Sequence, residues 1–225
     1  MFVRPLCAIA LLAPLAACRI VRPSTIPQEE PYVVVVASSR LPRTRPWISR
    51  FAHHTWFDVK QGDESTWHRV EVPGDGPGID DRPVSAAQVR SDLRLGRETR
   101  VLALLTSDEA KSAAQEIRRL AAVYEDSDVY RPIPGPNSNT FVERIARRTP
   151  GLSVELHHNA VGKDYAQIVH VGISATKTGV ELETPILGLQ AGLKEGLELH
   201  FFQLTFGIGL VPPALKIPFV DRLGF

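Results

Sequence analysis

The C-terminal segment, residues 180–225, alternates apolar residues with glycine and polar residues, and this pattern constrains the fold more than any other feature of the chain. A period of two is typical of β-strands, and glycines divide the segment into short apolar runs. Its apolar content exceeds what one face of a hairpin requires. We therefore expect a sheet that is buried on both sides. The alternative is an apolar face left open to acyl chains or to a lipid surface.

The residues before this segment predict an α+β domain, in which an antiparallel sheet packs against two main helices and is followed by a strand-rich C-terminal part. Residues 73–98 are rich in Gly, Pro and Asp, and we expect a long irregular excursion there. The other expected elements are a strand over 33–37, a hairpin over 48–59 and 66–72 that turns at 61–63, a strand over 101–105, a helix capped by Ser107, and a second helix over 139–148.

The N-terminus predicts a secretory signal. An apolar run from Leu6 to Ala17 follows the single cation Arg4 and is too short to span a bilayer. The run ends in Leu15-Ala16-Ala17-Cys18, which resembles the bacterial lipobox. The resemblance implies cleavage before Cys18 and diacylation of its sulfur, whereas an ordinary cleavage site with an incidental cysteine is the alternative.

The expected organisation follows from this signal. Residues 1–17 form the lipoprotein signal peptide, residues 18–31 the lipidated N-terminus and a Pro-rich tether, and residues 32–225 a single α+β domain. The membrane is then a partner through the lipid anchor, and the protein lies in the cell envelope and faces the periplasm. An aspartate directly after the lipidated cysteine resembles the inner-membrane retention signal of enteric lipoproteins. This chain has Arg19 at that position, so the outer membrane is slightly favoured.

Charge and cysteine content exclude several classes of function. The chain has 26 Lys and Arg against 25 Asp and Glu, which removes the electrostatic argument for nucleic-acid binding. Two cysteines exclude a disulfide framework and a Cys-based zinc module. We expect no cofactor and no metal site, because the adjacent histidines of His53-His54 and His157-His158 diverge on a strand. Lys163-Asp164 is expected in a solvated turn, and the oligomeric state is not indicated.

The first candidate cluster is His53-His54-Thr55-Trp56 with Trp67-His68 on the partner strand. If the hairpin turns about residue 61, paired positions sum to about 122, so His54 lies opposite His68 on one face. His53 then belongs to the other face and is solvent-facing or structural. An ordinary cross-strand polar pair is the alternative for His54 and His68.

The second cluster is Pro134-Gly135-Pro136-Asn137-Ser138-Asn139-Thr140-Phe141, a turn that delivers Ser138 to the start of a helix. Unpaired backbone N–H groups at a helix start can stabilise an oxyanion or a nucleophile's developing negative charge. The alternative is helix capping, because residues 137–139 are good caps and Thr140–Glu143 fits a capping box.

Together the two clusters resemble a known arrangement. A His-Thr-x strand followed by an Asn-x-Asn-x-Phe helix start is similar to the circularly permuted papain-like group, which includes PPPDE peptidases and lecithin:retinol acyltransferase relatives within the NlpC-type assemblage. Residues 32–225 also resemble a family of uncharacterised bacterial lipoproteins. The matching residues are His54-Thr55-Trp56, the motif from Pro134 to Phe141, Asn159-Ala160-Val161-Gly162-Lys163-Asp164-Tyr165, and Leu215-Lys216-Ile217-Pro218.

This resemblance implies a hydrolase or acyltransferase that acts on an amide or ester, with Ser138 in place of the usual nucleophilic cysteine. Serine needs a well-placed base, and the resemblance assigns His54 to that role and His68 to orienting it. The remaining substrate or oxyanion candidates are Asn137, Asn139 and Trp56. The alternative is a non-catalytic envelope module that binds a ligand in the same cleft. The ligand, whether peptide, peptidoglycan or lipid, is not specified.

Overall fold

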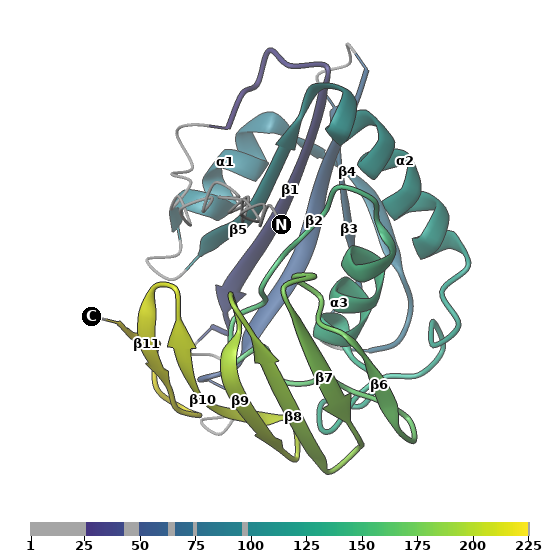
Figure 1. Ribbon diagram of the computed structural model, residues 1–225. Helices are drawn as coiled ribbons and strands as arrows, with labels where there is room; N and C mark the ends of the chain where they lie inside the picture. Colours follow the sequence, from purple (N-terminus) through teal and green to yellow (C-terminus); the bar gives the residue numbers. More distant parts are fainter. Residues whose placement is uncertain (1–25, 43–49, 63–65, 74–75, 96–98, 225) are drawn as a thin grey trace, which may run out of the picture.

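The computed structural model describes residues 26–42, 50–62, 66–73, 76–95 and 99–224 (Figure 1). The signal peptide, Cys18 and most of the tether lie outside the described residues. Within them the fold is α+β, as expected, with two antiparallel sheets and three helices. Among the described helices, none combines the length and apolar character needed to cross a bilayer.

The first sheet has five antiparallel strands in the order β4-β3-β2-β1-β5. The β-branched run at residues 33–36 lies on β1, an interior strand between β2 and β5, and is fully buried. The elements of this part are β1 (Tyr32–Arg40), β2 (His53–Gln61), β3 (Thr66–Glu71), β4 (Asp80–Ser85), α1 (Ala86–Leu95), β5 (Arg100–Thr106), α2 (Ser107–Ala122) and α3 (Ser138–Arg148).

Each face of this sheet buries its own core, because side chains alternate between the faces along every strand. Phe57 and Val59 of β2 face α2 and α3 and pack in one cluster with Ile117 and Phe141. Trp56 faces the other side and packs in a second cluster, with Trp67 and with Val89 of α1. The helices α1 and α2 accordingly lie on opposite sides of the sheet (Figure 1).

The second sheet is a seven-stranded antiparallel meander in the order β12-β11-β10-β9-β8-β7-β6. Its strands are β6 (His170–Ile173), β7 (Gly179–Glu183), β8 (Leu187–Gly192), β9 (Gly196–Phe201), β10 (Leu204–Leu210), β11 (Pro213–Lys216) and β12 (Leu223–Gly224). The sheet lies beside α3, with one face toward the rest of the molecule (Figure 1). Its other face remains exposed and apolar, so the expectation of a sheet buried on both sides is wrong.

Residues 73–98 also differ from expectation. The segment contributes β4 and α1 rather than a wholly irregular excursion. Strand β4 pairs along its whole length with β3, from Thr66 opposite Ser85 to Glu71 opposite Asp80. Its extended conformation therefore depends on a neighbouring strand, which a local composition of Asp, Arg and Pro does not reveal.

Candidate functional site

Helix α3 begins inside the motif Pro134–Phe141, and Asn137 caps it. Asn137 Oδ1 accepts hydrogen bonds from the backbone N–H groups of Asn139 (2.9 Å) and Thr140 (3.3 Å). Thr140 Oγ1 accepts one from the backbone N–H of Asn137 (3.1 Å), which completes a capping box. The box lies one turn earlier than the predicted Thr140–Glu143. Ser138 is therefore the first helical residue and is 5% exposed, and within the described part of the chain its hydroxyl forms no hydrogen bond.

The amide groups of Asn137 and Asn139 join three separate segments. Asn137 Nδ2 donates to the backbone oxygens of Pro132 (3.1 Å) and Val161 (3.0 Å). Asn139 Nδ2 donates to those of His53 (2.8 Å) and Val161 (3.0 Å). Both donors of each amide are thus engaged, and the N–H groups of Asn139 and Thr140 are occupied by the cap. This corrects the predicted oxyanion role of Asn137 and Asn139, because the proposed donors already have acceptors.

Gly162 shows why the Asn159–Tyr165 motif accompanies the helix start. The residue has φ of +86°, and a Cβ there would lie 2.3 Å from Asn137 Nδ2. Its carbonyl accepts a 2.6 Å hydrogen bond from Thr140 Oγ1. Glycine is therefore required both by the left-handed backbone and by the close approach of the asparagine.

The structure also corrects the choice of histidine. His53 shares its face of β2 with Thr55 and Phe57, toward α3, and is only 3% exposed. His54 lies on the opposite face, where its Nε2 is 2.7 Å from Glu71 Oε2. The sheet thus separates the His54 side chain from the helix that Ser138 begins. The sequence predicts that His53 is solvent-facing or structural. It does not face solvent, because its side chain is buried.

His68 and Trp56 are also placed differently from their predicted roles. The β2–β3 register sets Val59 opposite His68, so paired positions sum to 127 and His54 does not face His68. His68 Nδ1 instead lies 2.9 Å from Asp81 Oδ1. The buried Trp56 donates through Nε1 to Asp58 Oδ2 (2.9 Å), on the same face as His54. The structure does not bring these residues together with Ser138.

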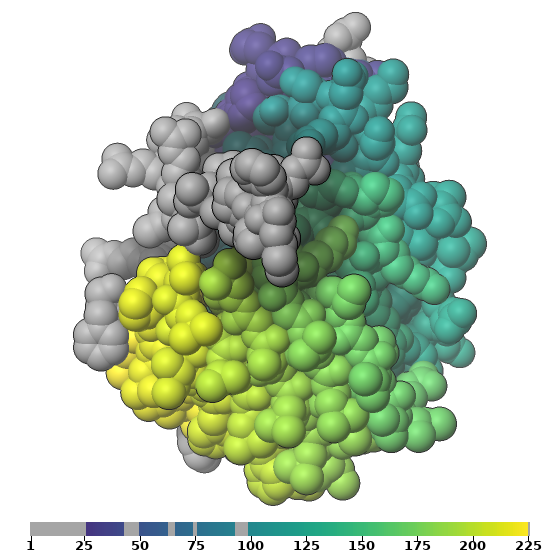
Figure 2. Space-filling model, viewed as in Figure 1, coloured from purple at the N-terminus to yellow at the C-terminus, as the bar shows by residue number. Residues whose placement is uncertain are grey.

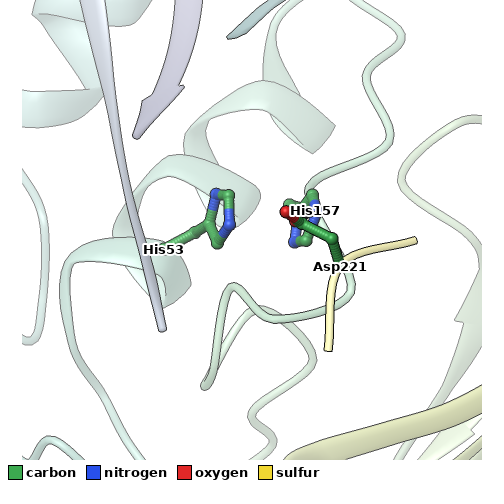
Figure 3. A group of neighbouring side chains, drawn as sticks. All are labelled: His53, His157 and Asp221. Carbon is green, nitrogen blue, oxygen red and sulfur yellow. Dashed lines mark ion pairs between the residues drawn. The ribbon is translucent and has the colours of Figure 1, made fainter. Parts of the chain in front are cut away.

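A different histidine cluster lies at the beginning of β2 (Figure 3). The rings of His53 and His157 stack with centroids 3.8 Å apart and planes 11° from parallel. His157 Nε2 lies 3.6 Å from Asp221 Oδ1, which comes from the C-terminal tail. Burial lowers the pKa of His53 to about 4 and lowers that of His157 further, so both rings are neutral at pH 7. No local motif joins these three residues, which explains why sequence reasoning missed them.

The donor atoms of this cluster are close enough to suggest a metal site, but their orientation does not fit one. A metal binds an imidazole through a lone pair in the ring plane, and two parallel stacked rings direct those lone pairs alongside each other. His157 Nδ1 also accepts a hydrogen bond from the backbone N–H of Asn159 (3.1 Å). The neutral ring therefore carries its proton on Nε2, the atom directed at Asp221. His53, His157 and Asp221 therefore form a packed polar cluster, to which the C-terminal tail contributes Asp221.

Lys163-Asp164 belongs to a second, buried set of charges rather than to a solvated turn. Lys163 Nζ lies 2.5 Å from Asp164 Oδ2 and 3.1 Å from Glu198 Oε2 on β9. The buried ring of His200 lies between Glu183 (2.7 Å) and Glu198 (3.0 Å). Burial lowers the pKa of His200, but the surrounding carboxylates outweigh this effect and raise it to about 9. Burial raises the pKa of Glu183 to about 7.

Comparison with known proteins places the first part of the chain in a family context. The family model described as "Protein of unknown function (DUF3750)" matches residues 33–165, which include the first sheet, α3 and the loop that Asn137 and Asn139 bind. No curated protein and no solved structure matches the chain.

Proposed function

The chain belongs to the DUF3750 family, which is described as being of unknown function, and from that premise we propose that it is a membrane-anchored envelope protein acting as a non-catalytic binding or structural module. The single observation that carries this choice is the engagement of Asn137 and Asn139. Their four amide donors hold together α3, the start of β2 and the loop at Val161. A group that must stabilise an oxyanion needs donors directed at empty space.

The anchor part of the proposal rests on Leu15-Ala16-Ala17-Cys18, which lies outside the described residues. In this proposal the chain is cleaved before Cys18, acylated there, and held at the periplasmic side of the outer membrane. Metabolic labelling with a fatty-acid analogue tests it. The native protein should incorporate the label and Cys18→Ser should not. Label in the Cys18→Ser variant, or none in the native protein, would contradict the proposal.

The non-catalytic part is tested at Ser138. A hydroxyl-directed covalent probe should leave Ser138 unlabelled. Within the described residues no side chain forms a hydrogen bond with its hydroxyl, so none is positioned to accept the proton. Probe labelling that disappears in Ser138→Ala, with an unchanged unfolding midpoint, would instead support an enzyme. A serine hydrolase labelled in parallel shows whether the probe itself is competent.

A serine-variant papain-like hydrolase or acyltransferase is the second candidate, and one contact favours it. The hydrogen bond from Asn139 to the His53 carbonyl places β2 next to the first turn of α3, and His53 is the neutral histidine on that face. If this candidate is correct, Ser138→Cys should introduce ester hydrolysis that His53→Ala abolishes. If hydrolysis in Ser138→Cys is independent of His53, the papain-like assignment fails.

A further inference from the structure

The second sheet has an unusual distribution of polarity. Every outward side chain on β6–β11 is apolar, while glutamate, glutamine, histidine and lysine occupy inward positions. The register confirms the alternation, because Leu189 pairs with Leu199 and Gln190 with Glu198 on adjacent strands. Four outward leucines at the centre of the sheet are between 43% and 59% exposed: Leu182, Leu189, Leu197 and Leu199. A sheet with one wetted face has the opposite pattern, with apolar side chains inward.

The inward polar groups find partners within the molecule. Glu181 lies 2.7 Å from Arg147 of α3, and Lys216 Nζ lies 2.6 Å from Glu155 Oε1. Together with the pair between Lys163 and Glu198, these contacts attach the sheet to the rest of the chain through charges. The apolar side chains of the sheet therefore point outward. Buried charge in this quantity is tolerated only when each group is paired.

The two ends of the sheet also differ. The β7–β8 and β9–β10 turns, residues 184–186 and 202–203, contain no charged residue and expose Ile186 and Phe202. At the opposite end Lys177 in the β6–β7 turn is exposed, whereas Lys194 in the β8–β9 turn donates through Nζ to Ser153 Oγ (3.2 Å). The same outer face is continuous over the green and yellow part of the surface in Figure 2. An apolar surface with the cation Lys177 at one end and no charge in the two turns at the other matches the change from anionic headgroups to acyl chains in a bilayer.

We infer that this outer face binds a lipid bilayer, with its leucine, isoleucine and phenylalanine side chains inserted among the acyl chains. A protein partner is a poorer match, because protein interfaces form about one hydrogen bond per 100–200 Å² and the outward side chains here offer no polar group. Hydrocarbon requires none. The sheet then lies tilted on the membrane, with the end at Ile186 and Phe202 deeper among the acyl chains and Lys177 at the level of the headgroups.

The inference rests on the proposed function in one respect, because the lipid at Cys18 keeps the face near the bilayer. Ile26 packs in the core with Trp56 and Trp67, and Lys60 Nζ donates to the backbone oxygens of Gln28 and Glu30, so residues 26–31 belong to the folded part. Residues 19–25 are left as the tether between the lipid and the domain, with a reach of roughly 22 Å at ~3.1 Å per residue.

A fluorescent reporter on the face tests the inference. The acylated mature chain has no free thiol, because Cys7 leaves with the signal peptide and Cys18 carries lipid. An environment-sensitive thiol dye is therefore attached to Leu199→Cys, and to Glu109→Cys on the exposed side of α2 as the matched control. The native-length lipoprotein is reconstituted into vesicles of phosphatidylethanolamine and phosphatidylglycerol, with a spin-labelled lipid as membrane quencher and iodide as aqueous quencher.

We expect blue-shifted emission at Leu199→Cys, quenching by the spin-labelled lipid and protection from iodide, with the reverse at Glu109→Cys. Equal iodide quenching at both positions would overturn the inference. Protection at Leu199→Cys without quenching from the lipid would also overturn it, since a second copy of the chain would then cover the face. A chain without a reporter cysteine takes up the dye only if Cys18 is not acylated. This control detects a missing anchor by itself, so failure of the anchor and failure of the face are distinguishable.

Discussion

The side-chain amide of Asn139 donates a 2.8 Å hydrogen bond to the backbone carbonyl of His53, which precedes it by 86 residues. The same amide donates to the carbonyl of Val161. Asn139 therefore joins the first turn of α3 to the start of β2 and to the loop that follows His157. The motif that sequence reasoning associates with catalysis forms a buried joint between three segments in the structure.

The first prediction separates this joint from its neighbour Ser138. Asn139→Ala removes two donors and leaves the buried carbonyl of His53 without the amide, while the carbonyl of Val161 keeps Asn137 Nδ2 as a donor, so the free energy of unfolding should fall by about 1–3 kcal/mol. Ser138→Ala removes a hydroxyl without a hydrogen-bond partner and should cost less than about 1 kcal/mol. Urea unfolding of the two variants measures both changes. Equal losses would show that the joint does not depend on the amide.

The second prediction concerns Gly162, and Gly151 provides the control. Both residues have left-handed φ, of +86° and +76°, but a Cβ at Gly151 would meet nothing within 4 Å. Gly151→Ala should therefore cost only the backbone strain, about 1–2 kcal/mol. Gly162→Ala should cost clearly more, because its Cβ displaces the Asn137 side chain that caps α3. Thermal unfolding compares the two, and equal midpoints would contradict the role assigned to Asn137.

The elements that could be predicted from the sequence are those with a local signal. The run Val33–Val36 and the helix at Ser107 have the expected composition and apolar spacing, and both form where expected. The expected cap is wrong, because Ser107 is the first helical residue, and Thr106 at the N-cap position makes no side-chain capping hydrogen bond. The register of β2 and β3 depends on how the two strands are connected, which residue types alone do not define. A shift from the expected register gives His54 the carboxylate of Glu71 as partner instead of His68.

The polarity of the second sheet could be predicted only in part. A period of two predicts the strands, but it does not specify which of the two faces is buried. That choice depends on partners from distant segments, such as Arg147 for Glu181 and Glu155 for Lys216. The cluster of His53, His157 and Asp221 was missed for the same reason, since its members come from a strand, a loop and the tail.

The third prediction is a loss of stability in acid through His53. Burial lowers its folded-state pKa to about 4 from an ordinary value of 6.5, so the unfolded chain binds protons more readily. The contribution of neutral His53 to stability should be complete above pH 6.5 and should be lost as the pH falls from 6.5 to 4. Ring nitrogen NMR should find His53 still neutral at pH 5.5. A midpoint near 6.5 would contradict the buried, uncharged stack.

The last prediction is a loss of stability in base through His200. Its pKa is raised to about 9 in the folded state, so its contribution is complete below pH 6.5 and lost as the pH rises through 9. The raised pKa of Glu183, about 7, acts in the same direction at lower pH. The free energy of unfolding should therefore fall by on the order of 3 kcal/mol between pH 6.5 and 9. His200→Gln should remove most of this slope, whereas His68→Gln, in an exposed pair with Asp81, should keep it. Guanidinium unfolding across this range measures the slope, and an unchanged slope in His200→Gln would show that the buried carboxylates are held by Lys163 and Lys216 alone.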